Sequence, residues 1–393
     1  MQPNPVLGIS SDTLQKSGAV YTAQEIAQQP ALWQQTCRTV LEAESQITTF
    51  YQAHLNAGPV DIIFTGAGTS AFIGNSLECL YQHNTGKPAR AIATTNLATH
   101  PQHYFRKDIP TCLVSFARSG DSPESIAAVR LANQLCPTVS HIIITCNAEG
   151  TLAREATPEN SLILLLPPET NDKGLAMTGS YTSMLLTGIL LSHLPQLQDM
   201  VAKVDQLAEY GRRIIAEYTG PIQEMCALDI QRAVFLGSGP MLGCAEECHL
   251  KLQELTDGAV ISKFDSFMGF RHGPKAVVNA NSLMVYLISP EPYVQQYERD
   301  LIDAVNTGQQ GLYRIGISEN PVDGIELDLA IVLNRDNAVE LGSDFLPVCY
   351  TLVGQLAGFY KSLQLGLQPD TPSASGTISR VVQGVTLYDF PSS

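Results

Sequence analysis

Short apolar runs alternate with segments of helical period along most of this chain, and this alternation is the feature that most constrains the fold. The first series has apolar runs at 60–66, 112–116, 141–146 and 161–167, with helical segments near 69–83 and from Pro123 and Gly179. The second has apolar runs at 232–238, 260–264, 283–289, 312–318 and 329–334, with helical segments near 240–256, 292–306 and 345–365. Continuous apolar runs separated by helices are typical of parallel strands buried on both faces. The pattern predicts an α/β protein.

The two series repeat one plan. FTGAGTS at 64–70 and FLGSGPM at 235–241 each close the first apolar run of their series. This repeat predicts two tandem doubly wound parallel-sheet domains. The expected organisation is a helical N-terminal extension at 1–56, a first sheet domain at 57–218, a second at 219–368 and a C-terminal tail at 369–393.

The ends of the chain carry patterns of their own. Thr22 and Glu25 are spaced as a helix capping box, and Trp33 lies in the next helical segment, where we expect it to anchor the extension to the body. The tail is rich in Ser, Gly and Pro and then β-like. We expect it to be an ordered extension that packs near the functional site.

Charge and cysteine content argue against several classes of function. The chain of 393 residues has a formal net charge of −15 and no block rich in Lys or Arg, which disfavours nucleic acid and anionic membranes as partners. Exposed charges are screened beyond about 10 Å, so a small anion can still bind where donors gather. Nine cysteines without a C-x-x-C pair, no leader pattern and no apolar stretch of about 20 residues predict a cytoplasmic protein with reduced thiols.

The turn after the first apolar run is a candidate phosphate site. Gly66, Gly68, Thr69 and Ser70 follow a predicted strand and open a predicted helix, where backbone N–H groups and the helix dipole favour an anion. A dinucleotide fingerprint also matches these glycines, but it needs an acidic residue about 20 positions later, and the stretch ARAIATTN has none. A tight glycine turn that binds no ligand remains the other interpretation.

A second hydroxyl-rich turn follows the next strongly apolar run and contains Arg118, Ser119 and Ser122. Ser122 as a helix N-cap and Pro123 as the first helical residue would explain this turn on structural grounds alone. Both turns, however, leave successive parallel strands at their carboxyl ends, where open α/β sheets bind ligands. Together they predict a site for a monophosphate.

Three charged residues of the second series lie at helical spacing. Glu247, Lys251 and Glu254 occupy positions i, i+4 and i+7 beside an apolar stripe. On an exposed face they would form a ladder of ion pairs worth about 0.2–0.5 kcal/mol each, which is the commoner arrangement. If the helix faces a cleft, Glu254 is a candidate base, because partial burial raises the pKa of a carboxyl group toward neutrality. Lys251 would then offset developing oxyanion charge.

His272 lies in the segment FRHGPK, in which Gly-Pro is expected to fix the following turn. A single histidine is usually structural or merely exposed. The other histidines, His100 and His103 included, have no clear partners for a metal. We assign neither a metal nor a cofactor.

The motifs GAGTS, SFARSGDSPES, LKLQELTDG and FRHGP, in this order, resemble the sugar isomerase (SIS) domain family in its duplicated, flavodoxin-like form, as in the isomerase half of glucosamine-6-phosphate synthase. The similarity covers residues 56–390. RSGDSPES, the helical N-terminus and the tail PDTPSASGTISRVVQGVTLY are more similar to the AgaS group. That group comprises galactosamine-6-phosphate deaminase/isomerases, formerly called tagatose-6-phosphate ketose/aldose isomerases.

The resemblance implies roles for residues of this chain. The two turns would bind the sugar phosphate, and the glutamate of LKLQE would move a proton between C1 and C2. The histidine of HGP would assist ring opening across a subunit interface, which implies at least a homodimer. The implied catalytic residues are Glu254, His272 and Lys251, and the implied substrate-binding residues are Gly68, Thr69, Ser70, Arg118, Ser119, Ser122, Glu247 and Arg380.

The chain departs from the synthase pattern at three places. Arg118 stands in the second turn where the synthase has no cation, and one hydroxyl is lost there. The stretch Met177–Thr182 lacks the lysine of its counterpart. The tail lysine that forms a Schiff base with a ketose is also absent, and Arg380 is the nearest cation. An arginine cannot form an imine, so the chemistry is expected to be acid–base throughout.

The expected reaction converts D-galactosamine 6-phosphate to D-tagatose 6-phosphate and ammonia. Three alternatives stay open: glucosamine 6-phosphate as the substrate, ketose/aldose isomerisation without loss of ammonia, and a non-catalytic sugar-phosphate sensor. None of the motifs reads the stereochemistry of a single hydroxyl. The expected partner is a small amino-sugar phosphate, with neither nucleic acid nor membrane.

Overall fold

The computed structural model describes residues 5–336, 338–380, 382 and 384–391. The chain forms two compact units. The first-sheet unit contains Gln34–Asn171, Gly179–Val201 and the tail from Ile378. The second-sheet unit contains the N-terminal residues up to Trp33, Asp172–Thr178 and Ala202–Thr377.

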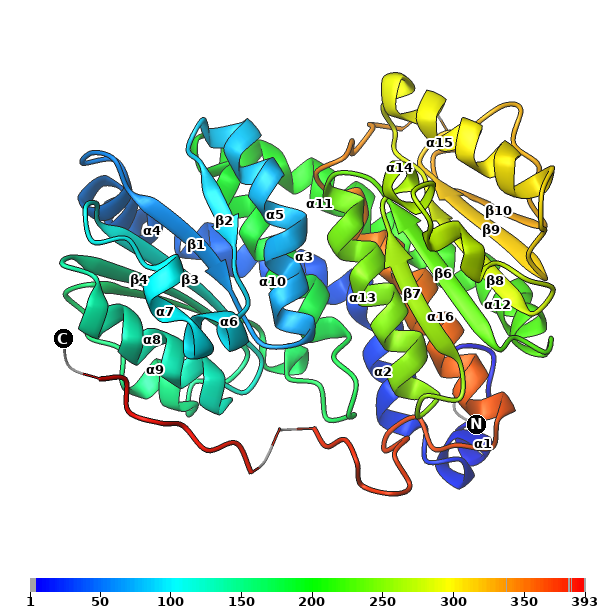
Figure 1. Ribbon diagram of the computed structural model, residues 1–393, viewed down its shortest axis with the longest axis horizontal. Helices are drawn as coiled ribbons and strands as arrows, with labels where there is room; N and C mark the ends of the chain where they lie inside the picture. The colour runs from blue at the N-terminus through cyan, green and yellow to red at the C-terminus, as the bar shows by residue number, and fades with distance from the viewer. Residues whose placement is uncertain (1–4, 337, 381, 383, 392–393) are drawn as a thin grey trace. The chain divides into compact units, whose positions relative to one another are not determined.

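The first-sheet unit is built on five parallel strands in the order β2-β1-β3-β4-β5 (Figure 1). Its strands are β1 (Asp61–Thr65), β2 (Ala89–Ala91), β3 (Thr111–Ala117), β4 (Val139–Thr145) and β5 (Ser161–Leu165). Every residue of β1 and β3 is buried, as expected for central strands covered on both faces. Strand β2 is not predicted from the sequence, because its three residues form no apolar run.

Helices cover both faces of the first sheet. They are α4 (Glu44–Phe50), the π-helix η1 (Tyr51–Leu55), α5 (Thr69–Thr85), α6 (Thr94–Thr99), α7 (Pro101–Tyr104), α8 (Pro123–Leu135), α9 (Thr151–Arg154), the 3₁₀ turn η2 (Pro168–Thr170), α10 (Gly179–Ser192) and η3 (Leu194–Asp199). All residues of α10 are buried, and this helix packs against α5. Its apolar character on all sides fits this position.

The second-sheet unit repeats the topology with strands in the order β10-β9-β8-β6-β7. They are β6 (Arg232–Gly237), β7 (Ile261–Asp265), β8 (Ser282–Leu287), β9 (Tyr313–Ser318) and β10 (Leu329–Val332), all parallel. Counted within each half, both sheets have the order 2-1-3-4-5. The prediction of a duplicated doubly wound fold is confirmed, and each sheet reverses its strand order beside its first strand, where ligands bind in such folds.

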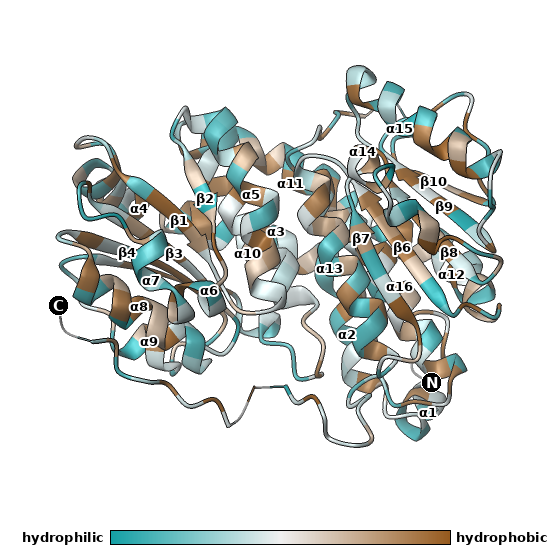
Figure 2. Ribbon diagram, in the orientation of Figure 1, coloured by the Kyte–Doolittle hydropathy of each residue, from teal (hydrophilic) through white to brown (hydrophobic). Residues whose placement is uncertain are grey.

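The helices of the second-sheet unit are α1 (Ser11–Lys16), α2 (Val20–Ala27), η4 (Ile214–Tyr218, a π-helix), α12 (Thr219–Cys226), α13 (Pro240–Leu255), α14 (Phe267–Phe270), η5 (Pro274–Val277), α15 (Pro292–Asn306) and α16 (Leu346–Gln364). The chain passes between the units within α3 (Gln29–Glu42) and α11 (Met200–Arg213). Figure 2 shows the apolar colouring of the central strands and of α16, which is buried from Leu346 to Ser362.

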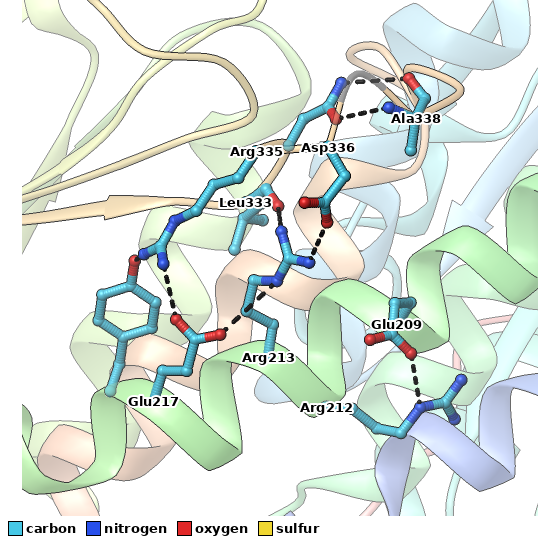
Figure 3. Close-up of polar contacts among 10 residues, drawn as sticks. Glu209, Arg212, Arg213, Glu217, Leu333, Arg335, Asp336 and Ala338 are labelled. Atoms are coloured by element: carbon cyan, nitrogen blue, oxygen red, sulfur yellow. Dashed lines mark hydrogen bonds and ion pairs between the residues drawn. The ribbon is translucent and has the colours of Figure 1, made fainter.

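Ion pairs connect the end of α11 to the loop after β10 (Figure 3). Arg213 Nη2 lies 2.6 Å from Asp336 Oδ2, and its Nη1 donates to the carbonyl of Leu333. Arg335 Nη1 donates to Glu217 Oε2 at 2.8 Å. These contacts are partly exposed, so each adds at most about 1 kcal/mol to stability, but together they fix the helix against the edge of the sheet.

The two units do not follow the four consecutive segments expected from the sequence. The N-terminal α2 packs on α16, so the extension joins the second sheet, and Trp33 is fully buried beside Gly211. The tail contributes Phe390 to the apolar cluster under α8 of the first sheet. Long-range packing thus assigns the two chain ends to opposite halves.

Two local predictions are wrong. The capping box does not form, because α2 begins at Val20. The hydroxyl of Thr22 instead donates to Asp370 Oδ1 at 2.8 Å, and Glu25 accepts from the Lys173 N–H at 2.6 Å. The described tail residues after 368 form no strand, so the β-like alternation reflects an extended segment rather than a sheet edge.

None of the nine cysteines, all of which lie in the described part of the chain, forms a disulfide. Within the part of the chain that the structure describes, every helix is too short or too polar to span a membrane.

Candidate active site

The turn after β1 is shaped by two glycines. A Cβ at Gly66 would lie 2.5 Å from the backbone carbonyl carbon of Ser70, so only glycine lets the turn close this tightly. Gly68 has a φ of +55° and forms the N-cap of α5. Thr69 and Ser70 follow in the first turn of the helix and are both 5% exposed. The turn therefore places hydroxyls and helix-end N–H groups together, as predicted for an anion site.

The turn after β3 is built by Ser119, Gly120 and Asp121. Gly120 has a φ of +73°. The side-chain amide of Asn147 donates to the Ser119 carbonyl at 2.9 Å, and both the N–H and the hydroxyl of Thr151 donate to Asp121 Oδ1 at 2.9 Å. The segment between β4 and α9 thus fixes this turn. Sequence reasoning missed both contacts, because Asn147 and Thr151 carry no motif.

Ser122 and Pro123 begin α8 as the structural interpretation predicts, with Ser122 at the N-cap and Pro123 as first helical residue. The Ser122 side chain, however, makes no capping hydrogen bond. Its hydroxyl is therefore not committed to the helix end, which favours the ligand-binding interpretation.

Arg118 and Arg380 are brought together within the first-sheet unit. Arg118 is 7% exposed, and its Nη2 donates to the backbone carbonyl of Arg380 at 2.6 Å. The Arg380 guanidinium in turn donates to Asn171 Oδ1 at 2.8 Å. The tail therefore reaches the second turn through its backbone, while the Arg380 side chain bonds elsewhere.

The charged residues of α13 form a buried cluster rather than a surface ladder. Lys251 Nζ lies 3.3 Å from Glu247 Oε1 and 2.7 Å from Glu254 Oε2. The side chains of Lys251 and Glu247 are 1% and 0% exposed, whereas that of Glu254 is 20% exposed. Among the three, Glu254 is the one that a solute can reach.

The charge of Lys251 is fixed by its neighbours. Burial alone lowers the pKa of this ammonium group, but the attraction of Glu247 and Glu254 outweighs burial and holds the pKa above its ordinary value. Lys251 is therefore a permanent cation at neutral pH. It supplies positive charge beside the exposed carboxylate and does not act as a base.

Two glycines of α16 allow α13 to approach closely. A Cβ at Gly354 would lie 2.5 Å from Cβ of Cys248, and one at Gly358 would lie 2.7 Å from the carbonyl oxygen of Lys251. The backbone that carries Lys251 is thus seated directly on α16. In the sequence, the only sign of this close contact is a pair of glycines four residues apart in an apolar helical segment, and it was not among the predicted features.

His272 is exposed in the turn between α14 and η5. Its N–H donates to the Gly269 carbonyl at 3.0 Å, and Gly273 follows with a φ of +119°. Within the described residues, no hydrogen bond or ion pair joins His272 to the α13 cluster. Its role across a subunit interface stays a prediction.

The arrangement provides two kinds of chemistry. The turns after β1 and β3 bring together hydroxyls, helix N-termini and a guanidinium, which suits a phosphate monoester. The α13 cluster pairs one accessible carboxylate with a buried cation, which suits proton transfer next to a developing negative charge.

Comparisons with known proteins identify the family. The SIS domain model matches residues 58–194. The chain is 39% identical to D-galactosamine-6-phosphate deaminase AgaS of Shewanella sp. strain ANA-3, over 97% of this chain and 95% of that protein. It is 37% identical to the protein of the same name from Escherichia coli, over 94% and 96%.

Solved structures share the fold. The crystal structure of tagatose-6-phosphate ketose/aldose isomerase from Escherichia coli matches with a TM-score of 0.86 and 34% identity, covering 95% of this chain and 97% of that one. The C-terminal domain of glucosamine-fructose-6-phosphate aminotransferase from Francisella tularensis shares the fold at a TM-score of 0.74 and 17% identity. The chain therefore belongs to the SIS-domain family, and within it to the AgaS group.

Proposed function

We propose that this chain is a D-galactosamine-6-phosphate deaminase that forms D-tagatose 6-phosphate and ammonia. The observation that carries the proposal is the α13 cluster, in which an accessible glutamate lies 2.7 Å from a buried ammonium group. Full-length identity to proteins named for this activity supports it.

In the proposed reaction, the open-chain amino sugar loses its C2 proton to Glu254, and the electron pair moves toward the C1 oxygen. The product of this step is an enolamine whose C1 oxygen carries negative charge. The ammonium group of Lys251 stabilises that charge. Glu254 then returns the proton to C1, and an N–H proton passes to the C1 oxygen, which leaves a hydroxyl group at C1 and an imine at C2. Water adds to this carbon and the C–N bond breaks, so that ammonia leaves and the ketose remains.

The remaining residues have binding roles in this proposal. Ser70, Ser119 and Ser122 donate to the phosphate oxygens, with Arg118 as the local cation. His272 transfers the proton during ring opening and is supplied by the partner subunit of a homodimer. The reaction needs neither metal nor cofactor, and we place the enzyme in the cytoplasm.

Ammonia release from D-galactosamine 6-phosphate tests the proposal, with D-glucosamine 6-phosphate as the C4 epimer and galactose 6-phosphate as the substrate without nitrogen. We expect ammonia and a ketose from the first compound at a kcat/KM well above that for the second. Absence of ammonia from both amino sugars would reject deamination.

A second function is favoured by one observation. The Escherichia coli protein whose structure matches at 34% identity is named a tagatose-6-phosphate ketose/aldose isomerase. The same proton transfer without an amino group would interconvert galactose 6-phosphate and tagatose 6-phosphate. Tagatose 6-phosphate formed from galactose 6-phosphate, with no ammonia from either amino sugar, would establish this function instead.

A further inference from the structure

The carbonyl group of Gly66, at the start of the turn after β1, is held by two donors of one residue. The N–H of Thr94 donates to this oxygen at 2.9 Å, and the hydroxyl of Thr94 donates to the same oxygen at 3.1 Å. Thr94 is the first residue of α6 and is 1% exposed, and Gly66 is buried. Water therefore cannot replace either bond, and the reaction proposed above gives Thr94 no role.

These bonds continue the pairing of β1 with β2 beyond the last residues of both strands. The Ile92 N–H donates to the Phe64 carbonyl at 2.9 Å, and the Thr94 N–H, two residues later, donates on the same side of the chain. The hydroxyl of Thr65 secures this joint from β1, because it donates to the Ile92 carbonyl at 2.6 Å. The short edge strand β2 thus brings Thr94 to the beginning of the turn.

The orientation of the peptide group between Gly66 and Ala67 follows from this anchor. All peptide bonds of the described chain are trans, and a trans peptide group directs its C=O and its N–H to opposite sides. The Gly66 carbonyl is directed toward the β2 side, so the Ala67 N–H is directed toward β3, the other neighbour of β1. Ser119 and Ser122 follow the end of β3. The Ala67 N–H therefore faces the side on which the second group of hydroxyls lies.

The Ala67 N–H is an unused donor. Among the residues that the structure describes, none accepts a hydrogen bond from it, whereas the Ala67 carbonyl accepts from the Ser70 N–H at 3.2 Å. Gly66 has no side chain that would restrict the peptide group, so the restriction must come from outside the turn. An N–H group that is held in a turn and left unpaired can bind an anion.

The second half shows that a turn of this shape folds without the hydroxyl. Thr94 and Phe267 begin the helices after β2 and β7, each three residues beyond the strand residue that pairs with the phenylalanine before the glycine turn. Phe267 has no hydroxyl, yet Gly68 and Gly239 have φ values of +55° and +56°. The Thr94 hydroxyl is therefore dispensable for the shape of the turn, and it is present beside the turn that carries Ser70.

We propose that Thr94 is a positioning residue for the phosphate site, which fixes the peptide group between Gly66 and Ala67 so that the Ala67 N–H donates to a phosphate oxygen. The inference rests on the proposed phosphate-binding function of the turn after β1. Thr94 itself touches no substrate. Without the anchor the peptide group can rotate, and apparent affinity falls with the fraction of molecules whose N–H is directed at the site.

Calorimetric titration of inorganic phosphate into the full chain tests this without turnover. Thr94→Val keeps the shape of the side chain and removes the hydroxyl, so we expect phosphate affinity to fall about two- to tenfold. Thr94→Pro removes both donors at the first position of a helix, where proline is otherwise favoured, and should weaken binding at least about tenfold. Thr94→Ser keeps both donors and should bind as tightly as the wild type.

Thr65→Val is the matched control. Thr65 is also 1% exposed, and its hydroxyl also donates to a backbone carbonyl, but that carbonyl lies outside the turn. We expect Thr65→Val to lower thermal stability as Thr94→Val does and to leave phosphate affinity near that of the wild type. Equal losses of phosphate affinity in these two variants, or no loss in Thr94→Val, would overturn the proposal.

The Ala67 amide reports the orientation of the peptide group directly. In a chain with isotope-labelled alanine, the Ala67 amide resonance is assigned by its absence from Ala67→Ser. We expect this resonance to shift when phosphate is added to the wild type and to Thr94→Ser. An unshifted resonance at saturating phosphate would show that the Ala67 N–H is not a donor to the anion and would overturn the proposal.

Ser70→Ala separates this inference from the proposed function. A loss of phosphate affinity in Ser70→Ala but in none of the Thr94 variants would overturn the role of Thr94 and leave the phosphate site in place. If Ser70→Ala also binds phosphate as the wild type does, the turn is not the phosphate site, and the role of Thr94 is rejected with it.

Discussion

The turns that follow β1 and β6 have the same backbone conformation but offer different hydrogen-bond donors. Gly68 and Gly239 have φ values of +55° and +56°, and each forms the N-cap of the next helix. After Gly68 come Thr69 and Ser70, whereas Pro240 follows Gly239 directly. Proline has no N–H, so the second turn offers an anion fewer donors. The two halves thus share the backbone geometry of the turn, whereas the hydroxyl groups that we propose bind phosphate follow only the first of the two glycines.

The segments that follow the neighbouring strands, β3 and β8, also differ in the donors that they offer to an anion. After β3 the chain presents Ser119 and Ser122, whereas after β8 the N–H of Ser289 donates to Glu298 Oε2 at 3.0 Å. Glu298 is fully buried. A carboxyl group of the protein itself therefore takes the donor that an anion would need. The second half instead carries the buried ion-pair cluster of Glu247, Lys251 and Glu254 on the helix after its glycine turn.

The helix after the second turn is expected to carry the chemical step. Glu254→Gln removes the proposed base and leaves the turns intact, so kcat should fall by about 10²–10⁴-fold while KM changes little. Ammonia release from D-galactosamine 6-phosphate measures both constants. Glu246→Gln on the same helix is the matched control, with kcat near that of the wild type. An unchanged kcat for Glu254→Gln would remove the acid–base role from α13.

Of the two glycine turns, which follow β1 and β6, only the one after β1 is expected to bind phosphate. Ser70→Ala should raise KM about 10- to 100-fold, because it removes a hydrogen bond to a charged group. Ser238→Ala in the turn after β6 should leave KM unchanged. Steady-state kinetics and titration of inorganic phosphate measure both. Equal effects of the two substitutions would show that the halves have not diverged in anion binding.

The buried carboxyl group of the second half should make stability depend on pH. Burial raises the pKa of Glu298 from 4.5 to about 8. Between these values the folded chain keeps a proton that the unfolded chain has released, so the free energy of unfolding falls as pH rises through this window. Relative to Glu298→Gln, the wild type should lose up to about 1.4 kcal/mol per pH unit. Parallel urea-unfolding curves for the two proteins from pH 5 to 8 would contradict this.

The helix pair α13–α16 of the second half and the pair α5–α10 of the first half should differ in how well they tolerate alanine in place of a glycine at the contact. A Cβ at Gly358 would meet the backbone of Lys251 at 2.7 Å, whereas one at Gly188 would meet the tip of the Leu77 side chain at 2.3 Å. A side-chain tip can rotate away and a backbone cannot. Gly358→Ala should therefore lower the free energy of unfolding by about 1–3 kcal/mol and also lower kcat, and Gly188→Ala should cost less. Chemical denaturation and kinetics of both variants check this, and a larger cost at Gly188 would reverse the comparison.

The sequence predicted most elements of both sheets, because central parallel strands are continuous apolar runs. It missed β2, since an edge strand of three residues needs little apolar surface. The capping box predicted from Thr22 and Glu25 does not form, because both side chains bond to residues far away in the chain. Local spacing does not reveal such contacts.

For the site, the chain itself determined which groups exist and at what spacing: two glycine turns, hydroxyls after only one of them, and a carboxylate, an ammonium group and a carboxylate on one helix face. Tertiary structure decided that Lys251 and Glu247 are buried while Glu254 is reachable, and that Asn147 and Thr151 fix the turn after β3. The reason is physical: burial and pKa depend on which distant segments cover a side chain, and helical spacing is the same on a covered face as on an exposed one.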